Sequence, residues 1–172
     1  DVVRGNLIHH FYDDHQYSEH RGTLGGSCMA GVPSKVLQLY IQNPEVCGLV
    51  ILYDDNGKLE NGKYTSDKIK GRAIVWHGAN CVGVEGTINF MDRIYTHNDS
   101  DIELFRQYAK FKKWHYKKFN QSSSETNMVA PDGTEVSPDE LTTIVKSGKY
   151  DSYPYLDTLK YYNKSSGELT TS

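Results

Sequence analysis

Val46-Cys-Gly-Leu-Val-Ile-Leu-Tyr53 opens the stretch that decides the fold, and this stretch runs on to Phe119. The continuous apolar run predicts a strand that is covered on both faces, and therefore a central one. Turn-forming residues follow at Asp54–Gly57. The polar excursion from there to Asp67 predicts a small hairpin or a mobile loop.

Two further strands are predicted over Lys68–His77 and Thr87–Tyr95, because mainly apolar residues alternate there with residues of mixed character. In the second strand, Asp92 falls in a row of apolar residues: Ile88, Phe90 and Ile94. An unpaired buried carboxylate is costly and titrates abnormally. We therefore expect Asp92 to have a positively charged partner, either Arg72 or Arg93.

An amphipathic helix follows the third strand. Ser100-Asp-Ile-Glu103 has the pattern of a capping box. Apolar residues then recur at helical spacing: Leu104, Phe105, Tyr108, Ala109 and Phe111. A last strand is predicted over His115–Phe119. The order strand, strand, strand, helix, strand predicts an α+β fold, with a mixed, mainly antiparallel central sheet flanked by about three helices.

The 172 residues are enough for one domain, 1–172, with a core over 46–119 and a polar loop over 120–127. The aromatic C-terminal segment 128–172 is predicted to pack on this core. Within it, Met128–Val136 predicts a hairpin, and Ser137–Gly148 predicts a helix that begins with a second capping box.

Composition excludes several classes of protein. The net charge of −3 argues against a binder that works by electrostatic attraction to nucleic acid or membranes. No apolar run reaches transmembrane length, and no signal peptide is recognised. Cys28, Cys47 and Cys81 form no disulfide pattern, which favours a reducing compartment.

The N-terminal segment carries four histidines, which raise the question of a metal site: His9, His10, His15 and His20. A zinc site needs three or four ligands in a defined geometry. Nothing in the spacing indicates one, so we predict neither a metal nor a cofactor.

Cys28 follows a pair of glycines and Ser27. A cysteine after such a turn can act as a nucleophile when a histidine serves as its base and an aspartate orients that histidine. It can equally be a small buried hydrophobe where two chain segments cross. The sequence leaves both interpretations open, and it holds no complete catalytic signature that would make the protein an enzyme.

The order of elements in 46–119 resembles the core of the GCN5-related N-acetyltransferases. In that family a glycine-rich loop between the third strand and the helix binds the pyrophosphate of acetyl-CoA. The corresponding segment here, Thr96-His-Asn-Asp-Ser-Asp101, has no glycine and no arginine, and it carries acidic residues. The resemblance therefore implies a topology and an acyltransferase alternative, without implying bound acetyl-CoA.

Four segments resemble a group of uncharacterised bacteriophage proteins: Gly22–Met29, Gly71–Trp76, Met91–Tyr95 and Tyr153–Thr158. The resemblance implies a viral origin and a place in the host cytoplasm or the virion. It carries no activity with it. The first hypothesis is accordingly a non-enzymatic module that binds a host or viral macromolecule.

The second hypothesis is an enzyme or a small-ligand binder, with a pocket formed by Cys28, Arg72, Asp92, Arg93 and Tyr95. An inward carboxylate with nearby arginines can hold a polar ligand or tune a general base. The alternative for the same residues is a structural ion pair.

The third hypothesis is single-stranded nucleic-acid binding, because aromatic residues alternate with lysines after the helix: Lys112, Lys113, Trp114, Tyr116 and Lys117. Base stacking beside cations is how such proteins bind. The acidic net charge of the chain makes this the least favoured of the three.

Overall fold

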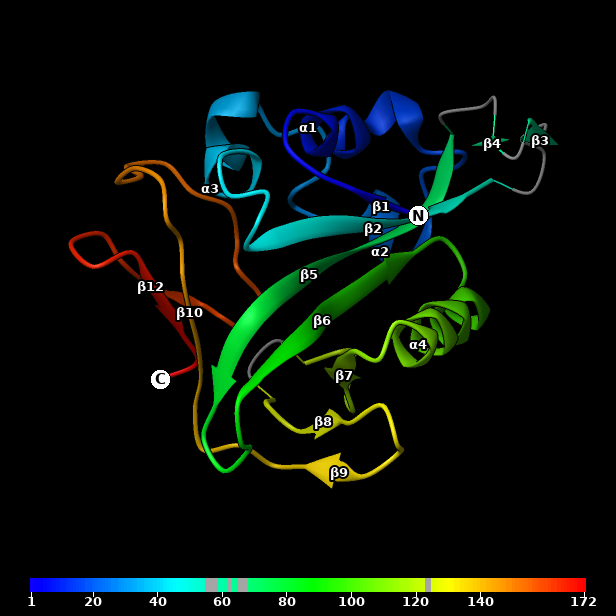
Figure 1. Cartoon of the computed structure of the whole chain (residues 1–172). Coiled ribbons are helices and arrows are strands. Elements are labelled where there is room, and N and C mark those ends of the chain that lie inside the picture. Colours follow the sequence, from blue (N-terminus) through cyan, green and yellow to red (C-terminus); the bar gives the residue numbers. More distant parts are fainter. Residues whose placement is uncertain (55–58, 62, 65–67, 123–124) are drawn as a thin grey trace.

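The computed structural model of the chain describes residues 1–54, 59–61, 63–64, 68–122 and 125–172. It shows a curled, mostly antiparallel sheet with helices on both faces (Figure 1). The predicted α+β class is confirmed. None of the helices in the described residues has the length and apolar character that a membrane span requires.

The sheet is organised around one long strand, β5 (Ile69–Cys81). Strand β6 (Thr87–Thr96) pairs antiparallel along one edge of it. The other edge is shared, because β2 (Cys47–Tyr53) pairs with the first part of β5 and β10 (Leu141–Ile144) with its end. A single strand therefore joins the N-terminal and C-terminal parts of the sheet.

Shorter strands extend the sheet on both sides. Strand β7 (His115–Lys117) is parallel to β6, and α4 connects the two. Strand β1 (Val2–Val3) pairs with β2. Beyond β7 the sheet continues with β8 (Met128–Val129) and then β9 (Glu135–Val136), and beyond β10 it continues with β12 (Glu168–Thr170) and then β11 (Tyr161–Asn163). The predicted hairpin over 128–136 is thus confirmed, and Gly133 takes a φ of +89° in its turn.

The described residues contain four α-helices, where about three were predicted: α1 (Leu7–Tyr12), α2 (Gly22–Gly25), α3 (Gln38–Ile41) and α4 (Ile102–Phe111). Three 3-10 turns accompany them: η1 (Asp14–Gln16), η2 (Ser34–Leu37) and η3 (Asp99–Asp101). Helices α1 and α3 lie on one face of the sheet and α4 on the other (Figure 1).

Each face of the sheet has its own apolar core. Residues of α1 and α3 pack on one face, where Leu49, Trp76 and Phe90 are fully or almost fully buried. Residues of α4 pack on the opposite face. Strand β2 contributes to both, through Leu49 on the first face and Val50 on the second. The apolar run at 46–53 is covered on both faces as predicted, although only β1 lies outside it in the sheet.

Helix α4 confirms the strongest helix prediction but corrects its details. No side chain caps its first turn, and the 3-10 turn η3 precedes it in place of the capping box expected at Ser100 and Glu103. Phe105 and Ala109 are buried, whereas Leu104 is 46% and Phe111 80% exposed. The buried stripe is narrower than predicted, because a single sheet face covers the helix.

The helix predicted over Ser137–Gly148 is wrong, and strand β10 lies there. Leu141 and Thr143 point to the interior while Ile144 is 54% exposed, as the alternation of a strand requires. The β-branched residues of Leu141-Thr-Thr-Ile144 favour a strand. Pairing with β5 and β12 on its two sides fixes that choice.

The two variable segments are only partly described. In the excursion after β2, β3 (Leu59–Glu60) pairs with β4 (Lys63–Tyr64), so the predicted hairpin is present. Residues 55–58, 62 and 65–67 lie outside the described residues. In the predicted loop 120–127, residues 123–124 lie outside them too, and the others form no helix or strand.

The aromatic segment packs on the core with only part of its surface. Tyr150, Leu156 and Leu159 are buried in the apolar core on the α1 and α3 face of the sheet. Tyr153, Tyr155 and Tyr161 each keep about half of their surface exposed.

Candidate functional site

The four segments singled out in the sequence meet at one place. A cavity of about 440 Å³ is lined by residues of three of them: Gly22, Thr23, Gly26, Ser27, Cys28, Arg93, Tyr95 and Tyr155. We call it the Cys28 cavity. The fourth segment lies behind its wall, where the Arg72 guanidinium donates a hydrogen bond of 3.1 Å to Ser27 Oγ. Three of the five predicted pocket residues therefore line the cavity, and Arg72 supports it from behind.

A β-bulge in β6 sets the direction of the side chains at the cavity. Ala73 pairs with Ile94 and Val75 with Met91, so Asp92 and Arg93 together lie opposite a single residue of β5. Ile94 consequently packs on the α4 face with Met91, whereas Tyr95 packs on the opposite face with Phe90. The alternation predicted for this strand stops at the bulge. Such irregularities turn side chains toward new neighbours, often at binding sites.

Polar groups satisfy the backbone around this bulge. The Asp92 carboxylate accepts a hydrogen bond of 2.8 Å from the Arg93 amide. Beyond the end of β7, the Asn120 side chain accepts from the Ile94 amide at 2.7 Å and donates to the Ile94 carbonyl at 2.9 Å. The side chain of Asn120 thus pairs with β6 as a neighbouring strand would.

Asp92 is 2% exposed, but its partners differ from the expected ones. Its carboxylate accepts from the Thr158 hydroxyl at 2.7 Å and from the Thr158 amide at 3.3 Å. Lys117 donates to the same hydroxyl at 2.6 Å and to the Glu125 carbonyl at 2.7 Å. The pairing of Asp92 with Arg72 or Arg93 is therefore wrong: the nearby cation is Lys117, reached through Thr158.

Burial perturbs both charged groups of this chain of contacts. It raises the pKa of Asp92, while the charge of Lys117 and the hydrogen bonds from Thr158 act in the opposite direction. It lowers the pKa of Lys117, which the charge of Asp92 partly offsets. Burial disfavours the charged form of any group unless a partner compensates, and here each group compensates the other.

A second carboxylate, Asp157, was missed by the sequence analysis. Its carboxylate accepts a hydrogen bond of 2.6 Å from the hydroxyl of Tyr95. Burial and then the charge of Asp92 raise the pKa of Asp157 to about 7. Burial and Asp157 also raise the pKa of Tyr95, so its hydroxyl remains a donor. The backbone of Asp157 has a φ of +47°, in the left-handed region that Asp tolerates better than most residues.

Arg72 is 2% exposed and has no carboxylate within 4.0 Å among the described residues. Its guanidinium carbon lies 4.2 Å from the ring centroid of Tyr12 and 4.8 Å from that of Tyr95. Aromatic faces attract a cation but carry no countercharge. The Nε of Arg72 has no hydrogen-bond partner.

Arg93 shares this lack of a counterion. Its guanidinium carbon lies 5.0 Å from the ring centroid of Tyr95, and its Nε is buried without a partner. Of the carboxylates in the described residues, none forms an ion pair with it. Arg72 and Arg93 thus place two guanidiniums beside one tyrosine at the wall of the cavity.

Cys28 is exposed, whereas Cys47 and Cys81 are buried. The cavity lining contains no histidine, so the described residues do not assemble the Cys–His–Asp arrangement that the nucleophile interpretation requires. The interpretation of Cys28 as a buried hydrophobe is wrong as well, because its side chain lies at the surface of the cavity.

The residues predicted for nucleic-acid binding do not form one surface. Trp114 is 4% and Lys117 3% exposed, and the Trp114 ring packs edge-on against Tyr108 at 5.7 Å. Lys112 and Lys113 are exposed and Tyr116 is half-buried. Neither the indole nor the buried ammonium is available for bases or phosphates.

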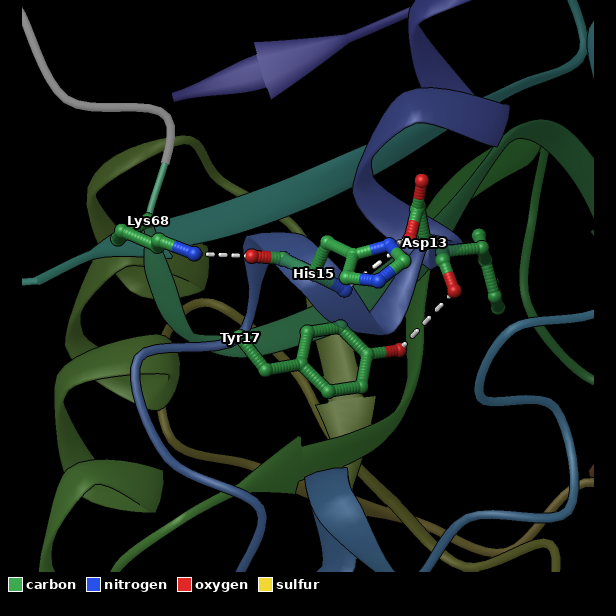
Figure 2. Close-up of polar contacts among 5 residues, drawn as sticks. Asp13, His15, Tyr17 and Lys68 are labelled. Atoms are coloured by element: carbon green, nitrogen blue, oxygen red, sulfur yellow. Dashed lines mark hydrogen bonds and ion pairs between the residues drawn. The ribbon is translucent and has the colours of Figure 1, made fainter.

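The four N-terminal histidines do not gather into a metal site. In the described residues, the one group with suitable spacing is Asp13, Asp14 and His15. His15 Nδ1 is hydrogen-bonded to Asp13 Oδ1 at 2.8 Å, and the Lys68 ammonium contacts the His15 carbonyl (Figure 2). These groups bind one another at the surface, and we assign no metal to them.

Comparison with known proteins gives no independent guide to this site. No protein-family model matches the chain, and searches of the curated proteins and of the solved structures found no match.

Proposed function

We propose that the protein is a binding module whose recognition site is the Cys28 cavity. The observation that supports this proposal is the meeting of segments from residues 22–28, 93–95 and 155 around a cavity of small-molecule size, with Arg72 behind it. Concave sites with a few convergent polar groups are the usual form of ligand sites. Tyr95 at the cavity wall donates a hydrogen bond to Asp157, a carboxyl whose pKa is raised to about 7. Titratable groups with a shifted pKa are also typical of functional sites.

Binding is favoured over the acyltransferase alternative. An acyltransferase of the GCN5-related type would bind a pyrophosphate at the loop before α4. Here that loop carries Asp99 and Asp101, and Asp101 is buried 4.0 Å from the Lys70 ammonium. Two carboxylates at this position repel a pyrophosphate. The proposal therefore places the ligand in the Cys28 cavity and not at the loop.

The viral origin remains a prediction from the four segments, as does a host or viral macromolecule as the source of the ligand. In this proposal, the protein acts in the host cytoplasm or in the virion. The cavity recognises a small group that the partner exposes, and the half-exposed Tyr155 at its rim gives the partner an aromatic contact.

Cysteine alkylation tests the proposal directly, because the chain contains its own controls. Iodoacetamide should modify the exposed Cys28 in the folded protein and leave the buried Cys47 and Cys81 unmodified. Fragments from a library of neutral, cationic and anionic compounds would then be screened for slower modification of Cys28, measured by mass spectrometry.

A compound that protects Cys28 should also shift the NMR resonances of Ser27, Arg93 and Tyr95. The proposal is contradicted if no compound protects Cys28, or if the protecting compounds shift resonances only elsewhere. A variant with Cys28→Ser should retain the NMR shifts, since the thiol serves as the reporter and not as the ligand group.

A further inference from the structure

The polar groups that face the Cys28 cavity are hydrogen-bond donors. Ser27 Oγ accepts from Arg72 at 3.1 Å and from the Met29 amide at 3.1 Å, so both of its lone pairs are used and its O–H is left to donate. The Arg93 guanidinium has donors only. The Thr23 hydroxyl is already used, because it accepts from the Thr96 amide and donates to the Thr96 carbonyl.

No acidic side chain lines the cavity within the described part of the chain. The Tyr95 hydroxyl also lies at the wall, but it donates to Asp157. A ligand that enters therefore meets free donors from Ser27 and Arg93 and no charged acceptor.

Neither Arg72 nor Arg93 forms an ion pair with a carboxylate of the described residues. Asp92 and Lys117 cancel, whether both are charged or both neutral, since they act on each other through Thr158. Arg72 and Arg93 remain, and guanidiniums are always protonated in proteins. Both act on the carboxylate of Asp157, which burial keeps only partly ionised at neutral pH.

We propose that the Cys28 cavity binds an oxyanion, the carboxylate or phosphate group of its ligand, through the Arg93 guanidinium and the Ser27 hydroxyl. Arg72 is a positioning residue: it holds Ser27 with its hydroxyl hydrogen directed away from the guanidinium, and it supplies positive charge from behind the wall. Planar guanidiniums match both carboxylate and phosphate oxygens. This inference rests on the proposed function, because it names the ligand class of the same cavity.

The test compares acetate with acetamide, which has nearly the same shape and no charge, and includes inorganic phosphate as a second anion. Each is titrated into the folded chain at constant ionic strength, with NMR shifts of Ser27 and Arg93 and the alkylation rate of Cys28 as readouts. We expect saturable binding of acetate or phosphate with a Kd on the order of millimolar, as suits such small ligands, and no binding of acetamide.

Two variants locate the anion. Arg93→Gln should weaken binding about tenfold or more, since it removes the charged donor. Ser27→Ala should weaken binding several-fold, and it serves as the second variant if Arg93→Gln fails to fold. Arg106→Gln is the matched control: Arg106 also has a buried Nε without a partner and also lies over a tyrosine, Tyr116, but it has Glu103 at 3.9 Å and lies on α4. It should bind as the wild type does.

The outcomes separate the two proposals. If acetamide or another neutral compound binds at the cavity as well as acetate does, and Arg93→Gln changes nothing, the oxyanion inference is overturned while the binding function stands. If no compound binds there, both fail. Preference for phosphate over acetate, or the reverse, identifies which oxyanion the cavity accepts.

Discussion

Strand β6 takes part in two regions that are built in opposite ways. On the α4 face it belongs to an apolar layer, formed by Val50, Ala73, Val75, Met91, Ile94, Phe105, Ala109 and Trp114. At its bulge, β6 also contributes Asp92, Arg93 and Tyr95 to a polar cluster. The other members of this cluster are Arg72, Lys117, Asp157 and Thr158. The apolar layer depends on burial, which has no direction. The polar cluster depends on partners that must all be present, because a lone buried polar group is costly.

The largest effect should come from removing one partner of the polar cluster. Asp92→Ala removes the acceptor of the Thr158 hydroxyl and deprives the buried Lys117 ammonium of the countercharge of Asp92, and we expect a loss of about 3–5 kcal/mol in the free energy of unfolding. Urea unfolding measures it. Adding Lys117→Met should recover part of the loss, because the uncompensated charge is then gone. Simple additivity of the two single losses would show that the residues do not act as a unit.

Removing a large residue from the apolar layer should cost somewhat less. Phe105 is 3% exposed, and Phe105→Ala is expected to lower the free energy of unfolding by about 3–4 kcal/mol. Phe111→Ala is the matched control on the same helix, since Phe111 is 80% exposed, and it should change stability by less than about 0.5 kcal/mol. Equal losses for the two variants would contradict the assignment of the buried face of α4.

The polar cluster should also give stability a pH dependence that the apolar layer lacks. The folded protein keeps the Asp157 proton up to a pKa of about 7, whereas the unfolded chain releases it near 3.8. Asp157 therefore contributes stability at low pH that is lost as the pH rises from about 4 to about 7. Asp157→Asn removes this dependence and tolerates the same backbone conformation.

Relative to the wild type, Asp157→Asn should gain on the order of 2 kcal/mol between pH 4 and pH 7.5. An isolated group with this shift would give about 4 kcal/mol, and coupling to Asp92 reduces the share of Asp157. Unfolding curves across this pH range check it. A difference between variant and wild type that stays constant with pH would mean that Asp157 titrates as an ordinary carboxyl.

The smallest effect tests how closely α4 packs on the sheet. A Cβ at Gly71 would lie 2.7 Å from Phe105 Cε1, so Gly71→Ala should cost about 1–3 kcal/mol. In the Phe105→Ala background the ring is absent, and the same substitution should cost much less. An unchanged cost in that background would mean that another contact, such as Thr96 Cγ2 at 3.1 Å, is responsible.

These two regions differed in how far the sequence could predict them. Periodicity predicted the order of β2, β5, β6, α4 and β7, because burial of one face leaves a local pattern. It failed at Leu141–Ile144, where Leu141 and Val145 suit a helical stripe and a strand equally well, and only the neighbours β5 and β12 decide. Local pattern cannot show which strands will be adjacent.

The polar cluster was predicted in its members more than in its contacts. Polar residues in otherwise apolar strands led to the prediction that Arg72, Arg93 and Tyr95 lie together. In the structure both guanidiniums lie over the Tyr95 ring. The partners of Asp92 and Tyr95 were missed, since Thr158 and Asp157 lie 66 and 62 residues away in the chain. The bulge was missed too, because it depends on pairing with β5. The signal available in the sequence was the Tyr153–Thr158 segment, which contains both Asp157 and Thr158.

The hydrogen bonds from Thr158 to Asp92 also affect how the chain is made. A ribosome synthesises β5 and β6 long before it reaches residue 158, so the nascent chain carries Asp92 without its hydrogen-bond donors on Thr158 until that residue has been made. Asp92 gains these hydrogen bonds only when the contact with Thr158 forms, and a contact across 66 residues forms slowly compared with α4. Chains truncated before Thr158 should therefore accumulate as incompletely folded species that chaperones and proteases can recognise.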